Sequence, residues 1–197
     1  LPEPRGFLAP VAEVVHAAGG LYIADEVQSG FGRTGDAMWG FQRHHSSGSP
    51  LVPDLVTVGK PMGNGMPVAA TIVQPQLMAT FGRDVRYFNT FGGNAVSIAA
   101  AQAVLDIIRE ENLQQNAKVV GSSLRRMLQD LATQHQVIGD VRGAGLFLGV
   151  EIVRAGTTSE PDEDVAVRVV NALRRRRVLL GTAGLSNNVL KVRPPLV

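Results

Sequence analysis

One lysine at the end of an apolar segment has the clearest chemical potential in this sequence. Lys60 follows Leu55–Val58, a short run typical of a strand, and precedes the glycine-rich stretch 61–65. An amine held at the tip of a strand can form a Schiff base with an aldehyde. Lys60 is therefore a candidate nucleophile, provided that other functional groups lie close to it.

A carboxylate has the corresponding place further upstream. Asp25 ends the apolar run Leu21–Ala24. Ligands of parallel sheets bind at the edge where the strands end, so Asp25 and Lys60 can meet at that edge. A lysine for an aldehyde and a carboxylate for a pyridinium nitrogen are what pyridoxal phosphate requires of a protein. The pair therefore predicts a pyridoxal-phosphate site.

Three longer motifs carry a resemblance to a known family. They are DEVQSGFGRTG at 25–35, GKPMGNGMP at 59–67 and NTFGGN at 89–94. In this order and at this spacing they resemble the class III aminotransferases, which are pyridoxal-phosphate enzymes of fold type I. The sequence is similar in particular to a branch that contains alanine–glyoxylate aminotransferase 2-like proteins and phospho-lyases of amino-alcohol phosphates. Because the resemblance runs along the whole chain, it is more specific than any single glycine motif.

The resemblance implies a role for each of five residues. Lys60 would be catalytic, bonding to the cofactor and moving the proton at the substrate Cα. Asp25 would keep the pyridine nitrogen protonated, because a nearby opposite charge favours the charged form. Val27 would pack against the ring and Gln28 would hydrogen-bond its phenolic oxygen. Thr90 would reach the phosphate of a neighbouring subunit, so the resemblance implies a homodimer whose site is shared across subunits.

Three of these residues have a plainer structural alternative. Asp25 could be an ordinary strand-end carboxylate and Lys60 an exposed loop lysine. Thr90 or Asn94 could simply cap the helix that follows, although a hydroxyl and free amides at a helix start also suit a phosphate. The Gly-Asn-Gly-Met-Pro sequence after Lys60 favours a fixed turn and so argues against a mobile lysine.

Two cations near the C-terminus are candidate substrate ligands. In many family members an arginine three positions before a Pro-Pro pair binds the substrate carboxylate, because its planar fork matches two oxygens. Here Lys191 has that position and Arg193 directly precedes Pro194. Alternate strand residues share a face, so the two cations could form a phosphate-sized pair or merely line the sheet edge.

This departure leaves two reactions open for the parent enzyme. One moves an amino group from an amine or amino acid to a keto acid. The other is a phospho-lyase reaction that eliminates phosphate from a phosphorylated amino alcohol. A third possibility is that the chain has no activity of its own and acts only in association, because family members are much longer than 197 residues.

The expected fold is α/β, part of a fold-type-I transferase, because helical and strand-like patterns alternate. Residues 1–111 would be the C-terminal portion of the cofactor-binding large domain, and residues 112–197 a small domain that is incomplete at its end. Helices are predicted over 7–18, 95–111, 113–134 and from 165 to about 176. Strands are predicted over 21–24, 55–58, 68–73, 137–143, 146–153 and 189–193.

Composition excludes several classes of function. Hydrophobic residues make up 45% and charged residues 18% of the chain, as in ordinary globular proteins. The absence of cysteine excludes disulfides and thiolate metal sites. No metal is expected at His44 and His45, which are predicted to lie in a polar surface loop. The run Arg174–Arg177 is expected to be the solvated end of a helix and not a nucleic-acid patch.

The sequence also bears on location. No apolar run approaches the roughly 20 residues that a membrane-spanning helix needs. The N-terminal residues lack the basic region and apolar stretch of a secretory signal. We therefore expect a cytoplasmic protein with small-molecule substrates and neither membrane nor nucleic-acid partners.

Overall fold

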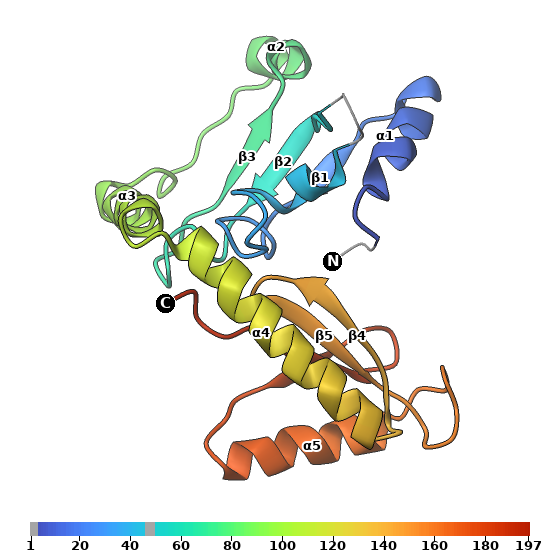
Figure 1. The fold of residues 1–197 in the computed structure, drawn as a ribbon. Coiled ribbons are helices and arrows are strands. Elements are labelled where there is room, and N and C mark those ends of the chain that lie inside the picture. The colour runs from blue at the N-terminus through green and yellow to red at the C-terminus, as the bar shows by residue number, and fades with distance from the viewer. Residues whose placement is uncertain (1–3, 46–49) are drawn as a thin grey trace. The chain divides into compact units, whose positions relative to one another are not determined.

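The computed structural model describes residues 4–45 and 50–197. The chain divides into two compact units, Pro2–Gln114 and Gln115–Val197. In Figure 1 the first unit runs from blue to green and the second from yellow to red. The boundary expected after residue 111 falls in the turn between α3 (Ala95–Glu110) and α4 (Leu113–Gln134).

The first unit contains a three-stranded sheet in the order β1-β2-β3. β1 (Ile23–Asp25) and β2 (Leu55–Val58) are parallel, and β3 (Ala70–Val73) runs antiparallel to β2. The antiparallel direction follows because residues 59–69 turn the chain back without a crossover helix. β3 begins two residues later than predicted, at Ala70.

One helix precedes the strands of this sheet in the chain, and two helices follow them. α1 (Leu8–Ala17) and α3 agree with the predicted segments. α2 (Pro75–Asp84) was not predicted, although Pro75 at its start is a favoured first helical residue. The short 3₁₀ helix η1 (Gly40–His44) was not predicted either.

His44 corrects the prediction of a polar surface loop. Its side chain is only 1% exposed in η1, whereas His45 is exposed and its Nδ1 accepts a hydrogen bond from the Leu51 amide at 2.8 Å. The prediction treated the adjacent histidines alike, but the 3₁₀ helix ends between them and directs them differently. Ser46–Ser49, also part of the predicted loop, lie outside the described residues.

The buried face of α3 differs from the predicted one. The helical spacing of apolar residues in 95–111 predicts a buried face that includes Val96 and Ile107, yet both are exposed. The buried residues are Ser97, Ala101 and Ile108. The helix carries apolar side chains around most of its circumference, so their spacing does not determine which face is buried. Its first turn is instead held in place by a hydrogen bond from Ser97 Oγ to the Pro67 carbonyl at 3.0 Å.

Asn94 begins α3 with a side-chain cap. Its Oδ1 accepts a hydrogen bond from the Ser97 amide at 3.0 Å. We expect Asn94→Ala to lower the free energy of unfolding by about 1 kcal/mol in urea titrations, because an orphan amide loses its acceptor. Asn94→Ser keeps an acceptor oxygen and should stay close to the original stability. Equal losses in both variants would contradict the capping role.

The second unit contains a four-stranded antiparallel sheet in the order β4-β5-β7-β6. The strands are β4 (Ile138–Ala144), β5 (Phe147–Ile152), β6 (Gly181–Ala183) and β7 (Val189–Val192). Its core is formed by five buried side chains, namely Val141, Val150, Ile152, Ala166 and Leu190. Ala166 comes from α5 (Glu163–Arg175), so this helix covers one face of the sheet.

The arginine run lies at the end of α5, as predicted. Arg174–Arg177 are all exposed, and Arg177 has a positive φ of 66°, which ends the helical geometry. Within residues 4–45 and 50–197, no helix combines the length and the apolar character that crossing a membrane requires.

Candidate cofactor site

The structure brings Asp25 and Lys60 to the same edge of the first sheet. Asp25 is the last residue of β1, and Lys60 follows the end of β2 by two positions. The two strands are parallel neighbours, with Asp25 opposite Thr57. The chain therefore leaves both strands on the same side, which is where open α/β sheets bind ligands. Both side chains are exposed to solvent.

The Asp25 carboxylate is oriented by two protein donors. Its Oδ1 accepts hydrogen bonds from the Val27 amide at 3.1 Å and from Thr57 Oγ1 at 3.2 Å. In the described part of the chain both donors bond to Oδ1, so Oδ2 is available to a partner from outside. The carboxylate is thus held by one backbone amide and one side chain of the neighbouring strand, and it is still accessible.

The turn after Lys60 is closed by successive backbone hydrogen bonds. The Met62 amide donates to the Gly59 carbonyl at 2.7 Å, and the Met66 amide donates to the Gly63 carbonyl at 3.0 Å. A Cβ added to Gly63 would lie 2.3 Å from the Met66 carbonyl oxygen, which leaves no room for a side chain. The fixed turn predicted from the sequence is therefore present.

Val27 connects the two strand ends. A Cβ built on Gly59 would lie 3.8 Å from both methyl groups of Val27, so this side chain lies against the backbone that leads into Lys60. Val27 and the following Gln28 are both half-buried in the turn after β1. Their contacts with a cofactor ring stay a prediction.

Thr90 lies in an exposed segment before α3. The Asn89 side chain shapes this segment by accepting hydrogen bonds from the Phe91 and Gly92 amides at 3.2 and 2.9 Å. Asn94 caps the helix, so capping does not account for Thr90. The Ser97–Pro67 hydrogen bond places the start of α3 beside the end of the turn that follows Lys60.

Glu26 is a functional candidate that sequence reasoning missed. Its side chain is only 2% exposed and accepts three hydrogen bonds, from Ser29 Oγ at 2.9 Å, the Gly40 amide at 2.8 Å and the Phe41 amide at 2.7 Å. Strand alternation was the available signal, because the residue after an exposed strand-end aspartate points to the opposite side.

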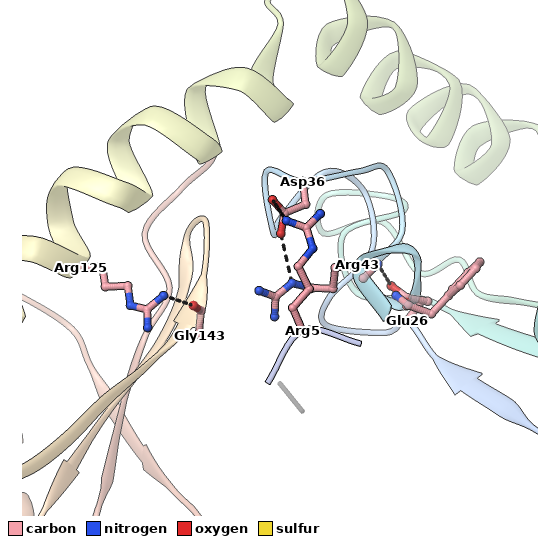
Figure 2. Close-up of polar contacts among 8 residues, drawn as sticks. Arg5, Glu26, Asp36, Arg43, Arg125 and Gly143 are labelled. Atoms are coloured by element: carbon pink, nitrogen blue, oxygen red, sulfur yellow. Dashed lines mark hydrogen bonds and ion pairs between the residues drawn. The ribbon is translucent and has the colours of Figure 1, made fainter. Parts of the chain in front are cut away.

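An ion pair holds another part of the segment between β1 and η1. The buried Arg43 donates from Nε to Asp36 Oδ2 at 3.1 Å, and Arg5 Nη1 lies 3.8 Å from Asp36 Oδ1 (Figure 2). The rings of Phe31 and Trp39 meet edge to face with centroids 5.2 Å apart. The whole segment between β1 and η1 is therefore packed against itself.

The predicted substrate ligands belong to the second unit. Lys191 lies on β7 and pairs with Gly149 and Gly181 on the two neighbouring strands. Leu190 points into the core, so alternation places Lys191 and Arg193 together on the other face of the sheet. Their position relative to Lys60 stays a prediction.

Arg193 is held by an aromatic ring. Its Cζ lies 5.0 Å from the centroid of the Phe147 ring, a cation–π contact. The guanidinium is half-buried, and this burial lowers its pKa from the ordinary value. Because an arginine pKa lies far above neutrality, the group still carries its charge at pH 7.

The residues of the first unit fit pyridoxal phosphate in chemical type. A carboxylate with an available oxygen and an amine on a fixed turn lie at adjacent strand ends, and an apolar side chain connects these two strand ends. Among the described residues, no cluster of three or more histidine, cysteine, aspartate or glutamate side chains could hold a metal ion. The carboxylate of Asp25 suits a cationic ring nitrogen and the amine of Lys60 suits an aldehyde.

Comparison with known proteins gives consistent similarities. The chain is 42% identical over 194 residues to ethanolamine-phosphate phospho-lyase homolog 1 of Caenorhabditis elegans, covering 98% of this chain and 41% of that protein. It is 45% identical over 191 residues to the mitochondrial alanine–glyoxylate aminotransferase 2 homolog 2 of Arabidopsis thaliana, covering 97% of this chain and 39% of that protein. The chain thus spans about two fifths of the length of these curated relatives.

A solved structure shows the same fold over the whole chain. A phospholyase from Arthrobacter, determined in complex with phosphoethanolamine, superposes with a TM-score of 0.91 and 44% sequence identity. The match covers 100% of this chain and 45% of that one. The mixed α/β structure therefore corresponds to part of the class III fold.

The family model for class-III aminotransferases matches residues 1–197, which is every residue of the chain. It agrees with the order of the three motifs and with the fold. This protein belongs to the class-III aminotransferase family, whose members depend on pyridoxal phosphate.

Proposed function

We propose that these residues form the lysine-bearing part of a pyridoxal-phosphate-dependent aminotransferase. The observation that carries the proposal is the placement of Asp25 and Lys60 at the ends of adjacent parallel strands. The reaction moves an amino group from an amine or amino acid to a keto acid. Because the curated relatives are more than twice as long, the activity belongs to the full-length protein.

Each residue contributes a distinct step. Pyridoxal phosphate, when bound, supplies an aldehyde for the substrate amine and a ring that accepts electron density from the substrate Cα. Asp25 holds the proton on the ring nitrogen through its charge. The Lys60 amine accepts the Cα proton, because a positioned lysine amine can act as a general base. Val27 and Gln28 orient the ring.

The proposed assembly is a homodimer in which Thr90 contacts the cofactor phosphate bound by the partner. The exposure of Thr90 and its position before the capped start of α3 support this arrangement. The expected cytoplasmic location also stays a proposal, since the name of one relative assigns that protein to mitochondria.

A second candidate reaction is elimination of phosphate from a phosphorylated amino alcohol. Lys191 favours it, because an ammonium group stands where many family members have the arginine that binds a carboxylate. Arg193 lies on the same face of the strand, which would provide a second cation for a phosphate group. The similarity to the phosphoethanolamine-bound phospholyase also supports this second candidate.

A product assay separates the two reactions. The full-length protein with pyridoxal phosphate should be given phosphoethanolamine in one experiment and alanine with glyoxylate in the other. Pyruvate formation without phosphate release supports the aminotransferase, and phosphate release without a keto-acid acceptor supports the lyase. Neither product from a protein that has bound the cofactor would contradict both assignments.

Lys191→Met tests the substrate site. Loss of a charge-assisted contact worth ~1.5–3 kcal/mol should raise the KM for phosphoethanolamine at least about tenfold. Lys118→Met removes an exposed ammonium from α4 and should leave the KM unchanged. A KM for Lys191→Met that equals that of Lys118→Met would show that Lys191 only lines the sheet edge.

A further inference from the structure

The buried carboxylate of Glu26 has no part in the chemistry derived so far, yet it lies next to Asp25 in the chain. It is 2% exposed, and the three donors to its oxygens are neutral groups. Burying a carboxylate costs several kcal/mol unless hydrogen bonds compensate for the lost water. Three such bonds provide this compensation, and hydrogen bonds to a charged group are about twice as strong as neutral ones.

These bonds hold the start of η1 against the end of β1. Gly40 and Phe41 are the first two residues of η1, so Glu26 accepts from amides that a 3₁₀ helix leaves without a partner. Ser29 Oγ donates to the same oxygen as the Gly40 amide. The carboxylate therefore joins three points of the segment that follows Asp25.

The backbone of Glu26 is fixed from the opposite side by β2. Its amide donates to the Thr57 carbonyl at 2.8 Å, which continues the parallel ladder by one residue. Thr57 also donates from Oγ1 to Asp25. Residue 26 is thus held between η1 on its side-chain side and β2 on its backbone side.

Packing leaves this arrangement little freedom to shift. A Cβ on Gly40 would lie 2.6 Å from Ser29 Cβ and 3.2 Å from Glu26 Oε2. A Cβ on Gly30 would lie 2.9 Å from the Glu26 carbonyl oxygen and 3.1 Å from the Trp39 ring. The pKa of Tyr22 is raised, first by its own burial and second by the nearby Glu26 charge.

The position of Glu26 affects Asp25 through one backbone amide. Val27 directly follows Glu26, and its N–H is one of the two protein donors that orient the Asp25 carboxylate. A displacement of Glu26 would move this donor and rotate the carboxylate. We propose that Glu26 is a positioning residue, whose buried carboxylate fixes the turn after β1 and so aims Asp25 at the cofactor nitrogen. This inference rests on the proposed function.

The test is a double-mutant cycle on cofactor affinity in the full-length protein. The apparent Kd for pyridoxal phosphate is measured by absorbance titration for the unaltered protein, Glu26→Gln, Asp25→Asn and the double variant. Glu26→Gln places an amide NH₂ opposite an N–H donor, so one hydrogen bond to a charged group is lost. This loss should raise the Kd about tenfold. In the Asp25→Asn background the same change should alter the Kd less than twofold, because residues that act through one another are not additive.

A purely structural role gives a different pattern. Glu26→Gln would then lower the Tm while the folded protein kept its Kd, or its effect would be equally large with and without Asp25. Either result overturns the inference. Failure of the unaltered protein to bind pyridoxal phosphate would instead contradict the proposed function.

Two further variants cover the case in which Glu26→Gln does not fold. Ser29→Ala removes one donor to Glu26 and keeps both amides, and it should raise the Kd about threefold, a smaller share of the same hydrogen-bond energy. Asp36→Asn loosens the same loop at the Arg43 ion pair without touching Glu26, and it should leave the Kd unchanged. Equal Kd values for Ser29→Ala and Asp36→Asn would overturn the inference.

Discussion

Lys60→Ala should reduce turnover of the full-length protein at least about a thousandfold, because general acid–base catalysis by one positioned group contributes 10²–10⁴ and the bond to the cofactor is lost as well. The measurement is steady-state turnover with saturating pyridoxal phosphate. Borohydride reduction followed by peptide mapping provides a second readout, since the cofactor should be trapped on the peptide that contains Lys60.

Lys118→Ala is the matched control for this experiment. The sequence contains three lysines, Lys60, Lys118 and Lys191, and Lys118 lies exposed on α4. Its removal should leave both turnover and trapping unchanged. Trapping of the cofactor at another residue, or more than a tenth of normal turnover in Lys60→Ala, would show that the strand-end amine is not the catalytic group.

Gly121→Ala should markedly destabilise the second unit. Gly121 lies buried within α4, and a Cβ there would be 2.2 Å from the Gly145 carbonyl carbon and oxygen. Because backbone atoms of the turn between β4 and β5 are the obstacle, helix and sheet would have to separate. We expect a loss of about 2 kcal/mol or more in urea unfolding, despite a gain of about 1 kcal/mol from helix propensity.

A second contact joins α4 to the sheet near Gly121, because Arg125 Nη1 donates a hydrogen bond to the Gly143 carbonyl at 3.4 Å (Figure 2). Gly82→Ala is the matched control, because Gly82 is in α2 and a Cβ there would meet no atom within 4 Å. That variant should gain about 0.5–1 kcal/mol, as expected when alanine replaces glycine in a helix. Losses of similar size at both positions would contradict the packing argument.

Several elements could be predicted closely from the sequence. α4 and β2 have the predicted bounds, 113–134 and 55–58. A long amphipathic pattern or a short apolar run with clear punctuation determines such elements locally. The same holds for the turn after Lys60, where Asn64 and Gly65 adopt positive φ values of 45° and 109°. Glycine and asparagine tolerate that geometry, so the residue types alone indicated it.

Other elements depend on contacts between distant segments. β6 is three residues long and contains a glycine, a weak strand former, and it exists because β7 pairs with it. The rotation of α3 follows from the Ser97–Pro67 hydrogen bond, across 30 positions. Periodicity within a segment carries no information about such partners.

The sequence alone determined the chemical types of the candidate site, a strand-end acid and a strand-end amine in turns of fixed geometry, because these properties depend on neighbouring residues. Only the tertiary structure decided that β1 and β2 are adjacent and parallel, which brings Asp25 and Lys60 to one edge. It also decided that Glu26 is buried and bonded to Gly40, 14 positions away. Pairing and burial are settled when remote segments meet, since the hydrogen-bond partners of a buried group come from whichever segment packs against it.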